Sequence, residues 1–250
     1  MNSVTIRALL VRGMLAGLAA GVLALVVAFL LGEPQVDAAI AFEEAHSHEH
    51  EMEVVSRGLQ STAGLATGVL VYGVALGGIA ALAFCFALGR IGRFGARATA
   101  VLLSGAALLA VYLVPFLKYP ANPPSVGDPD TIGTRTTLYF LMMLLSVLLS
   151  VAATILGRRL APKLGNWNAT VAAGAAFVAA VGLAYAFLPA VNEVPAGFSA
   201  TLLWQFRLSA IAIQLALWTA FGLVFGHLAE RVLPARQEAA AAERAAAAAS

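Results

Sequence analysis

Six long stretches of the chain contain no Asp, Glu, Lys or Arg, and this feature restricts the folds that are open to it. An α-helix needs about 20 apolar residues to cross the hydrocarbon layer of a membrane, and each stretch has about that length. Leu, Ala and Gly dominate the stretches, whereas a strand of a membrane barrel alternates apolar and polar residues over about ten positions. The sequence therefore predicts an all-α, polytopic membrane bundle of six transmembrane helices. They lie at about residues 8–31, 61–89, 98–117, 136–157, 169–189 and 208–228.

The overall composition excludes an ordinary water-soluble domain. Hydrophobic residues make up 61% of the chain and charged residues 11%, compared with about 45–50% and about 25% in soluble proteins. The first helix could be a signal peptide, since Arg7 and Arg12 precede its apolar run. That run exceeds the usual ~7–15 residues and no small-residue cleavage site follows closely, so we expect the helix to be retained.

The charged residues predict the orientation of the bundle. If the N-terminus lies in the cytoplasm, 11 of the 15 basic residues lie inside and 10 of the 13 acidic residues lie outside. Short loops rich in Lys and Arg stay on the cytoplasmic side. We therefore predict a multi-pass protein of a bacterial cytoplasmic (inner) membrane, with both termini inside. The helical domain covers residues 1–233, and an Ala-rich cytoplasmic tail covers 234–250.

The segment 43–53, in the first external loop, is a candidate metal site. It reads EEAHSHEHEME and holds three of the four histidines of the chain. In an extended chain the three imidazoles share one face, and they suit cobalt, nickel, copper or zinc without selecting among them. The alternative is a solvated acidic loop whose histidines are incidental. The predicted ligands are His46, His48, His50, Glu43, Glu44 and Glu49.

Other patterns limit the classes of function. The predicted helices contain no pair of carboxylates, and the chain has neither a phosphate-binding loop nor a cytoplasmic domain for a nucleotide, so we expect no enzyme and no nucleic-acid partner. Glycines recur every four residues in several helices, as at Gly13, Gly17 and Gly21. Small residues at this spacing let helices approach closely, either within one monomer or in a homo-oligomer.

Two external loops resemble a known family. The stretches FLKYPANPPSVGDPDTIGTR (116–135) and PAVNEVPAGFSATLLWQFR (189–207) are similar to loops of CbtA, a family of proposed cobalt transporter subunits. The stretch FEEAHSHEHE (42–51) followed by SRGLQSTAGL (56–65) is similar too. The resemblance covers the chain from the first helix to about Leu233. The loop residues that match are Lys118, Tyr119, Pro120, Asn122, Pro123, Pro124, Gly127, Asp128, Pro129, Asp130, Asn192, Glu193, Pro195, Trp204 and Arg207.

The resemblance implies a membrane subunit that supplies cobalt for cobalamin synthesis. It also implies a small, single-helix, histidine-bearing companion subunit, CbtB. No permanently bound cofactor is expected, and the transported ion would be Co2+, or alternatively Ni2+ or Zn2+. The family is described with five membrane segments, whereas the charge-free stretches here number six. The alternative function is a membrane protein that does not transport but holds a partner and buffers metal.

Three external arginines need partners. Arg57, Arg135 and Arg207 each stand near the N-terminal end of a predicted helix, where the helix dipole disfavours a cation. The ion pairs could simply hold the loops together. Combined with the family resemblance, we expect the carboxylates of the two similar loops to line an external vestibule below the histidine segment. The available external carboxylates are Glu33, Asp128, Asp130 and Glu193.

Overall fold

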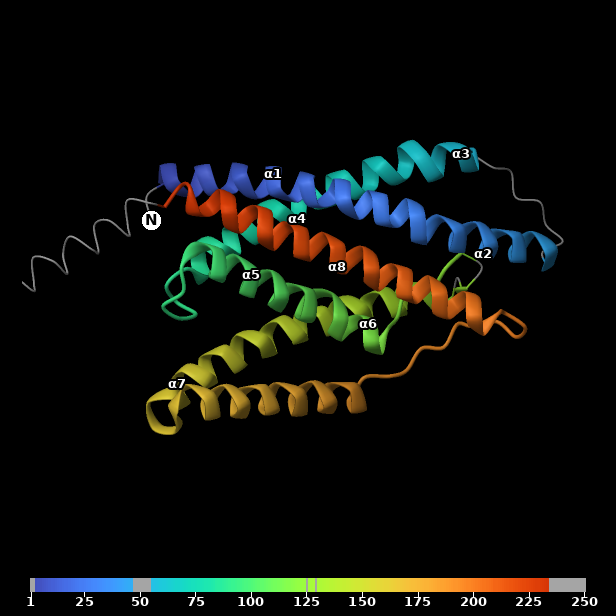
Figure 1. The fold of residues 1–250 in the computed structure, drawn as a ribbon. Helices are drawn as coiled ribbons and strands as arrows, with labels where there is room; N and C mark the ends of the chain where they lie inside the picture. The colour runs from blue at the N-terminus through green and yellow to red at the C-terminus, as the bar shows by residue number, and fades with distance from the viewer. Residues whose placement is uncertain (1–2, 47–54, 125, 129, 234–250) are drawn as a thin grey trace, which may run out of the picture. The chain divides into compact units, whose positions relative to one another are not determined.

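The computed structural model describes residues 3–46, 55–124, 126–128 and 130–233, and every regular element in them is helical (Figure 1). Within these described ranges, five helices are long and apolar enough to cross a membrane. This confirms the predicted all-α fold and agrees with a membrane-spanning protein. Five are counted instead of six because the predicted helices at 136–157 and 169–189 are parts of one helical element. The five are Ser3–Ala45, Arg57–Ala87, Ala96–Lys118, Ile132–Phe187 and Ala200–Glu230.

The longest element, α7 (Ile132–Phe187), is a hairpin of two helical arms. Gly165 has φ 74° and ψ 163°, a combination that is accessible almost only to glycine, and it interrupts the helix. Figure 1 shows α7 turning back on itself. The arms are close, since a Cβ at Gly157 would lie 3.3 Å from the Cβ of Ala173. The sequence prediction of two helices here therefore matches the two arms, but the helical structure also includes the short connection expected between residues 157 and 169.

The first helix is longer than predicted. α1 (Ser3–Val27) passes through a π-helical turn, η1 (Ala28–Gly32), into α2 (Glu33–His46). The prediction that the first helix ends at about residue 31 is wrong, because Pro34 does not end the helix and Glu33–His46 is helical. In the wide turn the Glu33 N–H bonds to the Ala28 carbonyl, five residues back. This wider turn accommodates the proline ring and its missing N–H.

In the third helix, too, a π-helical turn precedes a proline. α5 (Ala96–Ala107) leads into the π-helical turn η3 (Leu108–Leu113), where the Val114 N–H bonds to the Leu109 carbonyl. Pro115 follows in α6 (Val114–Lys118). The remaining elements are α3 (Arg57–Leu59), η2 (Gln60–Gly64), α4 (Leu65–Ala87) and α8 (Ala200–Glu230).

The chain divides into two compact units. The first unit comprises Met1–Leu25, Thr62–Gly105 and Ala216–Ser250. In it, α1 and α4 touch through backbone: a Cβ added at Gly73 would lie 2.6 Å from the Gly17 carbonyl oxygen. The glycine spacing noted in the sequence thus serves packing within the monomer at these positions. Phe84 and Phe225, both buried, meet edge to face with ring centroids 5.1 Å apart.

The second unit comprises Val26–Ser61 and Ala106–Leu215. It contains the α7 hairpin and two apolar clusters. One cluster joins Tyr119 to Met142 of the first arm of α7 and to Phe177 of its second arm. The other joins α2 to the two long loops, and it is described with the site below.

Large apolar side chains also cover the outside of the helices. Phe86 is 71% exposed, Val178 68% and Phe187 86%. Exposing these apolar side chains to water would cost free energy at each residue, whereas exposing them to lipid would not. Together with the helix lengths, this surface indicates a multi-pass membrane protein.

Candidate functional site

The predicted metal ligands are at the end of α2 and beyond it. Glu43 and Glu44 are exposed near the C-terminal end of α2, and His46 is its last residue. His48, Glu49 and His50 lie outside the described residues, so the metal site remains a prediction. Within the described residues, no group of three or more His, Cys, Asp or Glu side chains could hold a metal ion.

The structure shows instead what fixes the helix that leads to this segment. Ala39 of α2 is fully buried and packs with Val126 of the first similar loop and Phe198 of the second. Phe42 lies edge to face on Phe198, with ring centroids 5.0 Å apart. α2 is therefore docked on both loops four residues before the histidines begin.

A second contact fixes the chain where it returns from the histidine segment. Arg57 donates to Glu33 through Nη2, and its Nε lies 2.9 Å from Asp37 Oδ1. The Glu33 side chain is only 13% exposed, whereas Asp37 is 62% exposed. The two carboxylates stand one helical turn apart on α2, so one guanidinium neutralises both of them in part. The segment from His46 to Arg57 is thus held at its two ends by the same helix.

Glu193 is the centre of a buried polar network. Its side chain is 2% exposed and lies 3.2 Å from Arg135 Nη1. Thr131 Oγ1 donates to Glu193 Oε1 at 2.7 Å, and Asn122 Nδ2 donates to Oε2 at 3.3 Å. Arg207 donates to Asn122 Oδ1 at 3.1 Å. Every partner of Glu193 comes from the first similar loop or its flank, so this one carboxylate links the two loops.

Three further bonds join the loops, or the helix ends next to them, to one another. Tyr119 donates its hydroxyl to the Pro189 carbonyl at 2.8 Å, and Lys118 Nζ donates to the Tyr185 carbonyl at 2.8 Å. Tyr185 in turn donates to the Val114 carbonyl. Burial raises the pKa of the Tyr119 phenol, which therefore stays a donor throughout the neutral range. We call these bonds and the Glu193 network the loop clasp.

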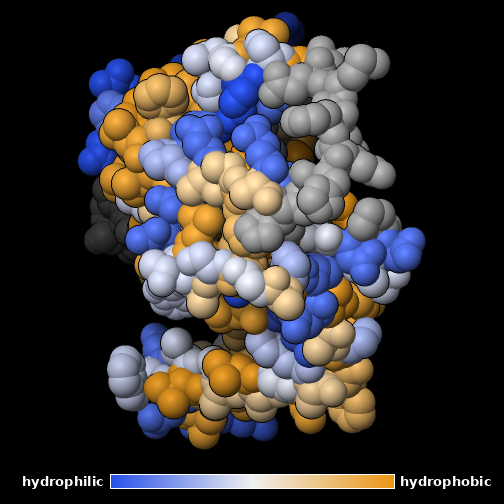
Figure 2. Space-filling model, turned by 90° about the vertical axis from the view of Figure 1, so that its right-hand side faces the viewer, coloured by the Kyte–Doolittle hydropathy of each residue, from blue (hydrophilic) through white to orange (hydrophobic). Residues whose placement is uncertain are grey.

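The three carboxylates expected to line a vestibule are in different settings. The Glu193 carboxylate is bonded to Arg135, Thr131 and Asn122 in the loop clasp. This favours the interpretation that its ion pair holds the loops together. Asp128 and Asp130 are exposed, and Asp128 Oδ1 accepts the Asp130 N–H at 2.9 Å. Neither forms an ion pair within the described residues. Figure 2 looks onto the face where α2 ends and the loops lie, and hydrophilic residues gather there among apolar ones.

A family model decides what kind of protein has this arrangement. The model of CbtA, described as a probable cobalt transporter subunit, matches residues 6–230. The chain belongs to the CbtA family. The match confirms the resemblance inferred from the loops, and it includes α2, the loop clasp and all five long helices of this CbtA chain. Neither a curated protein nor a solved structure matches it.

The sequence pointed to most residues of this CbtA loop region but not to all of their pairings. Arg57 with Glu33 and Arg135 with Glu193 were among the pairs that it allowed. Asp37 was missed, because its place one turn after Glu33 matters only if residues 33–46 are helical. Arg207 was expected to have a carboxylate partner. It donates instead to Asn122 and to the Ala121 carbonyl, and forms no ion pair within the described residues.

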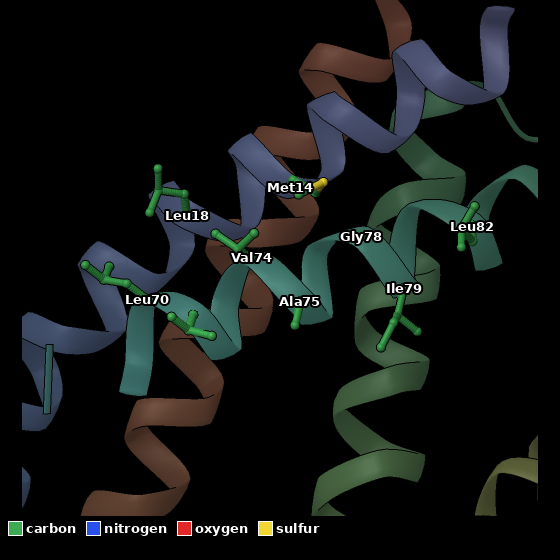
Figure 3. A pocket seen from close by; sticks show the side chains of 9 residues that line it. Met14, Leu18, Leu70, Val74, Ala75, Gly78, Ile79 and Leu82 are labelled. Carbon is green, nitrogen blue, oxygen red and sulfur yellow. The ribbon is translucent and has the colours of Figure 1, made fainter. Parts of the chain in front are cut away.

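The first unit of the chain contains an apolar groove of about 580 Å3 between α1 and α4 (Figure 3). Its lining is hydrophobic along both helices, with the Met14 thioether as the only polarisable group. A groove without oxygen, nitrogen or charged ligands suits an acyl chain or a helix face and gives a cobalt ion nothing to bind. The lining residues are Met14, Leu18, Leu70, Val71, Val74, Ala75, Gly78, Ile79 and Leu82.

Proposed function

We propose that this CbtA-family chain is the membrane subunit of a divalent-cation uptake system that supplies cobalt for cobalamin synthesis. Transport, and not catalysis, is the proposed activity. The observation that carries the proposal is the docking of α2 on the two similar loops, because it fixes the helix that leads into the segment with three imidazoles. The family description as a probable cobalt transporter subunit supports cobalt as the cargo.

We further propose six membrane crossings, with both termini in the cytoplasm of a bacterial cell. At 1.5 Å per residue a straight helix of the length of α7 would measure roughly 84 Å, far more than the ~30 Å hydrocarbon layer. The break at Gly165 supports one crossing for each arm, and the basic residues around it support a cytoplasmic turn.

Single-cysteine labelling tests this orientation. In a Cys85→Ser background, Leu164→Cys should react only from the cytoplasmic side and Asp128→Cys only from the outside. Labelling of both positions from the same side would overturn the assignment of two crossings to α7.

The histidine segment is proposed to collect the ion before it enters the bundle. Replacing His46, His48 and His50 together by alanine should lower cobalt accumulation when cobalt is limiting. His227→Ala is the matched control, because His227 lies at the other end of the sequence on α8, 3.5 Å from Arg97. Unchanged cobalt accumulation in the triple variant, at equal protein level, would remove the collecting role.

The second candidate is a binding or assembly protein that holds a small, single-helix, histidine-bearing subunit and buffers metal. It is favoured by the loop clasp, since Glu193 is fully used in holding the loops and is not available as an ion ligand. Cobalt flux into proteoliposomes separates the two candidates. Flux with the purified chain, alone or with its companion, supports transport, and no flux in either case supports the assembly role.

A further inference from the structure

The turn of the α7 hairpin carries a concentrated, exposed positive charge. Arg158 and Arg159 end the charge-free part of the first arm, and Lys163 stands two residues before Gly165. All three are exposed. Trp167, at the start of the second arm, is 78% exposed. The turn therefore presents three cations and one large aromatic ring within ten residues.

Carboxylates are remote from this turn in the sequence. No Asp or Glu occurs between Asp130 and Glu193, and neither Arg159 nor Lys163 forms an ion pair within the described residues. Arg159 and Lys163 are held close together and repel one another, so an anionic partner would stabilise the turn.

A second basic stretch, which connects α4 to the start of α5 and includes Arg90, Arg93 and Arg97, differs in how its charges are paired. There Arg97 is paired with Glu230, with Nε and Oε2 2.5 Å apart. Arg90 lies over the Phe86 ring at 4.8 Å and donates to the Phe86 carbonyl. Arg97 thus has a carboxylate partner in its own unit, whereas neither Arg159 nor Lys163 has one within the described residues.

The local backbone also suits an anion. The second arm begins directly after Gly165, and the first N–H groups of a helix have no partner within the helix and attract negative charge. Trp side chains favour the headgroup level of a membrane, where one part of the ring is wet and the other apolar. Ile155 and Val171, one on each arm, are 48% and 53% exposed, and they provide apolar surface next to the charges.

We propose that the turn of α7 binds the phosphate headgroup of an anionic phospholipid, whose acyl chains lie along the two exposed arms. The cations and the helix N-terminus hold the phosphate, Trp167 lies at the headgroup level, and the arms cover the chains. The site rests on the proposal that both arms cross the membrane, but it does not depend on cobalt as the cargo.

Thermal unfolding of the full chain in a neutral detergent tests this site. Titration with phosphatidylglycerol should raise the unfolding temperature, whereas phosphatidylcholine and inorganic phosphate should have little effect. In the variant R158A/R159A/K163A the apparent affinity for phosphatidylglycerol should fall on the order of a hundredfold. R90A/R93A is the matched control and should keep most of the effect.

A charge-conserving variant protects the test from a folding defect. R158K/R159K/K163R should fold and should keep the response to phosphatidylglycerol. Equal responses to phosphatidylglycerol and phosphatidylcholine, or an unchanged response in the alanine variant, would overturn the site. An equal response to inorganic phosphate would show a free-anion site and would also overturn the lipid proposal. Cysteine labelling at Asp128 and Leu164 decides separately whether the first arm crosses, so failure of the two proposals can be distinguished.

Discussion

The α1–α4 contact and the loop clasp hold their parts of the chain together by different means. In the first, Gly17 and Gly73 bring backbone against backbone. In the second, charged and hydroxyl groups link two loops through the buried carboxylate of Glu193. Lipid gives no hydrophobic gain when two apolar helices meet, so close packing must supply the attraction. Loops outside the hydrocarbon can instead use partner-specific polar bonds, which makes their geometry depend on single side chains.

The largest effect is expected from filling the glycine contact. In Gly17→Leu the added side chain would overlap the backbone of α4 around Gly73, and neither backbone can move without separating the helices. We expect a loss of about 3 kcal/mol or more in stability, or no folded protein at all. Gly68→Leu, on α4, is the control, because nothing lies within 4 Å of a Cβ built at Gly68. Unfolding in detergent should separate the two variants, and equal stability would contradict the importance of the contact.

The next effect is expected at the centre of the loop clasp. Glu193→Gln leaves Arg135 without its carboxylate, and we expect a loss of about 2 kcal/mol, because the pair is buried on the Glu193 side and partly exposed on the other. Asp128→Asn removes an exposed carboxylate from the same loop region and should change stability little. If Glu193 were instead a ligand of the transported ion, Glu193→Gln would lower uptake without lowering stability.

A smaller effect is expected at Arg57, which pairs with Glu33 and Asp37 of α2. Arg57→Gln releases Glu33 and Asp37, but Asp37 is 62% exposed and water replaces part of the interaction. We expect a loss of about 1 kcal/mol, which should shrink as salt is added. The measurement is the unfolding temperature of both proteins at low and high ionic strength. A difference that does not depend on salt would show that the contribution of Arg57 is not electrostatic.

The helices were predictable from the sequence to the extent that a local property defines them. Apolar length and the absence of charge are local, and they located every long helix of the structure. The end of the first helix could not be predicted in this way. A proline such as Pro34 usually stops a helix, and the π-helical turn before it allows α2 to continue. The pairings in the loop clasp depend on which residues meet in space. Arg207 has Asn122 as its partner, whereas Arg135 has Glu193, and no spacing in the sequence encodes that choice.

The smallest effect is expected at Tyr119, and its pH dependence sharpens the comparison further. Tyr119→Phe removes one hydrogen bond to the Pro189 carbonyl, which should cost about 0.5 kcal/mol near neutral pH. Burial raises the pKa of this phenol above its unfolded value of about 10, so the folded state favours the neutral form. That stabilisation is fully present below about pH 10 and is lost as the pH rises through the folded pKa.

The stability difference between the wild type and Tyr119→Phe should therefore be constant up to about pH 10 and narrow above it. The contact of Gly17 with Gly73 has no titratable group, so the difference between the wild type and Gly17→Leu should not narrow in this way. A Tyr119→Phe difference that is constant across pH 10 would show that the hydroxyl is not held in the loop clasp.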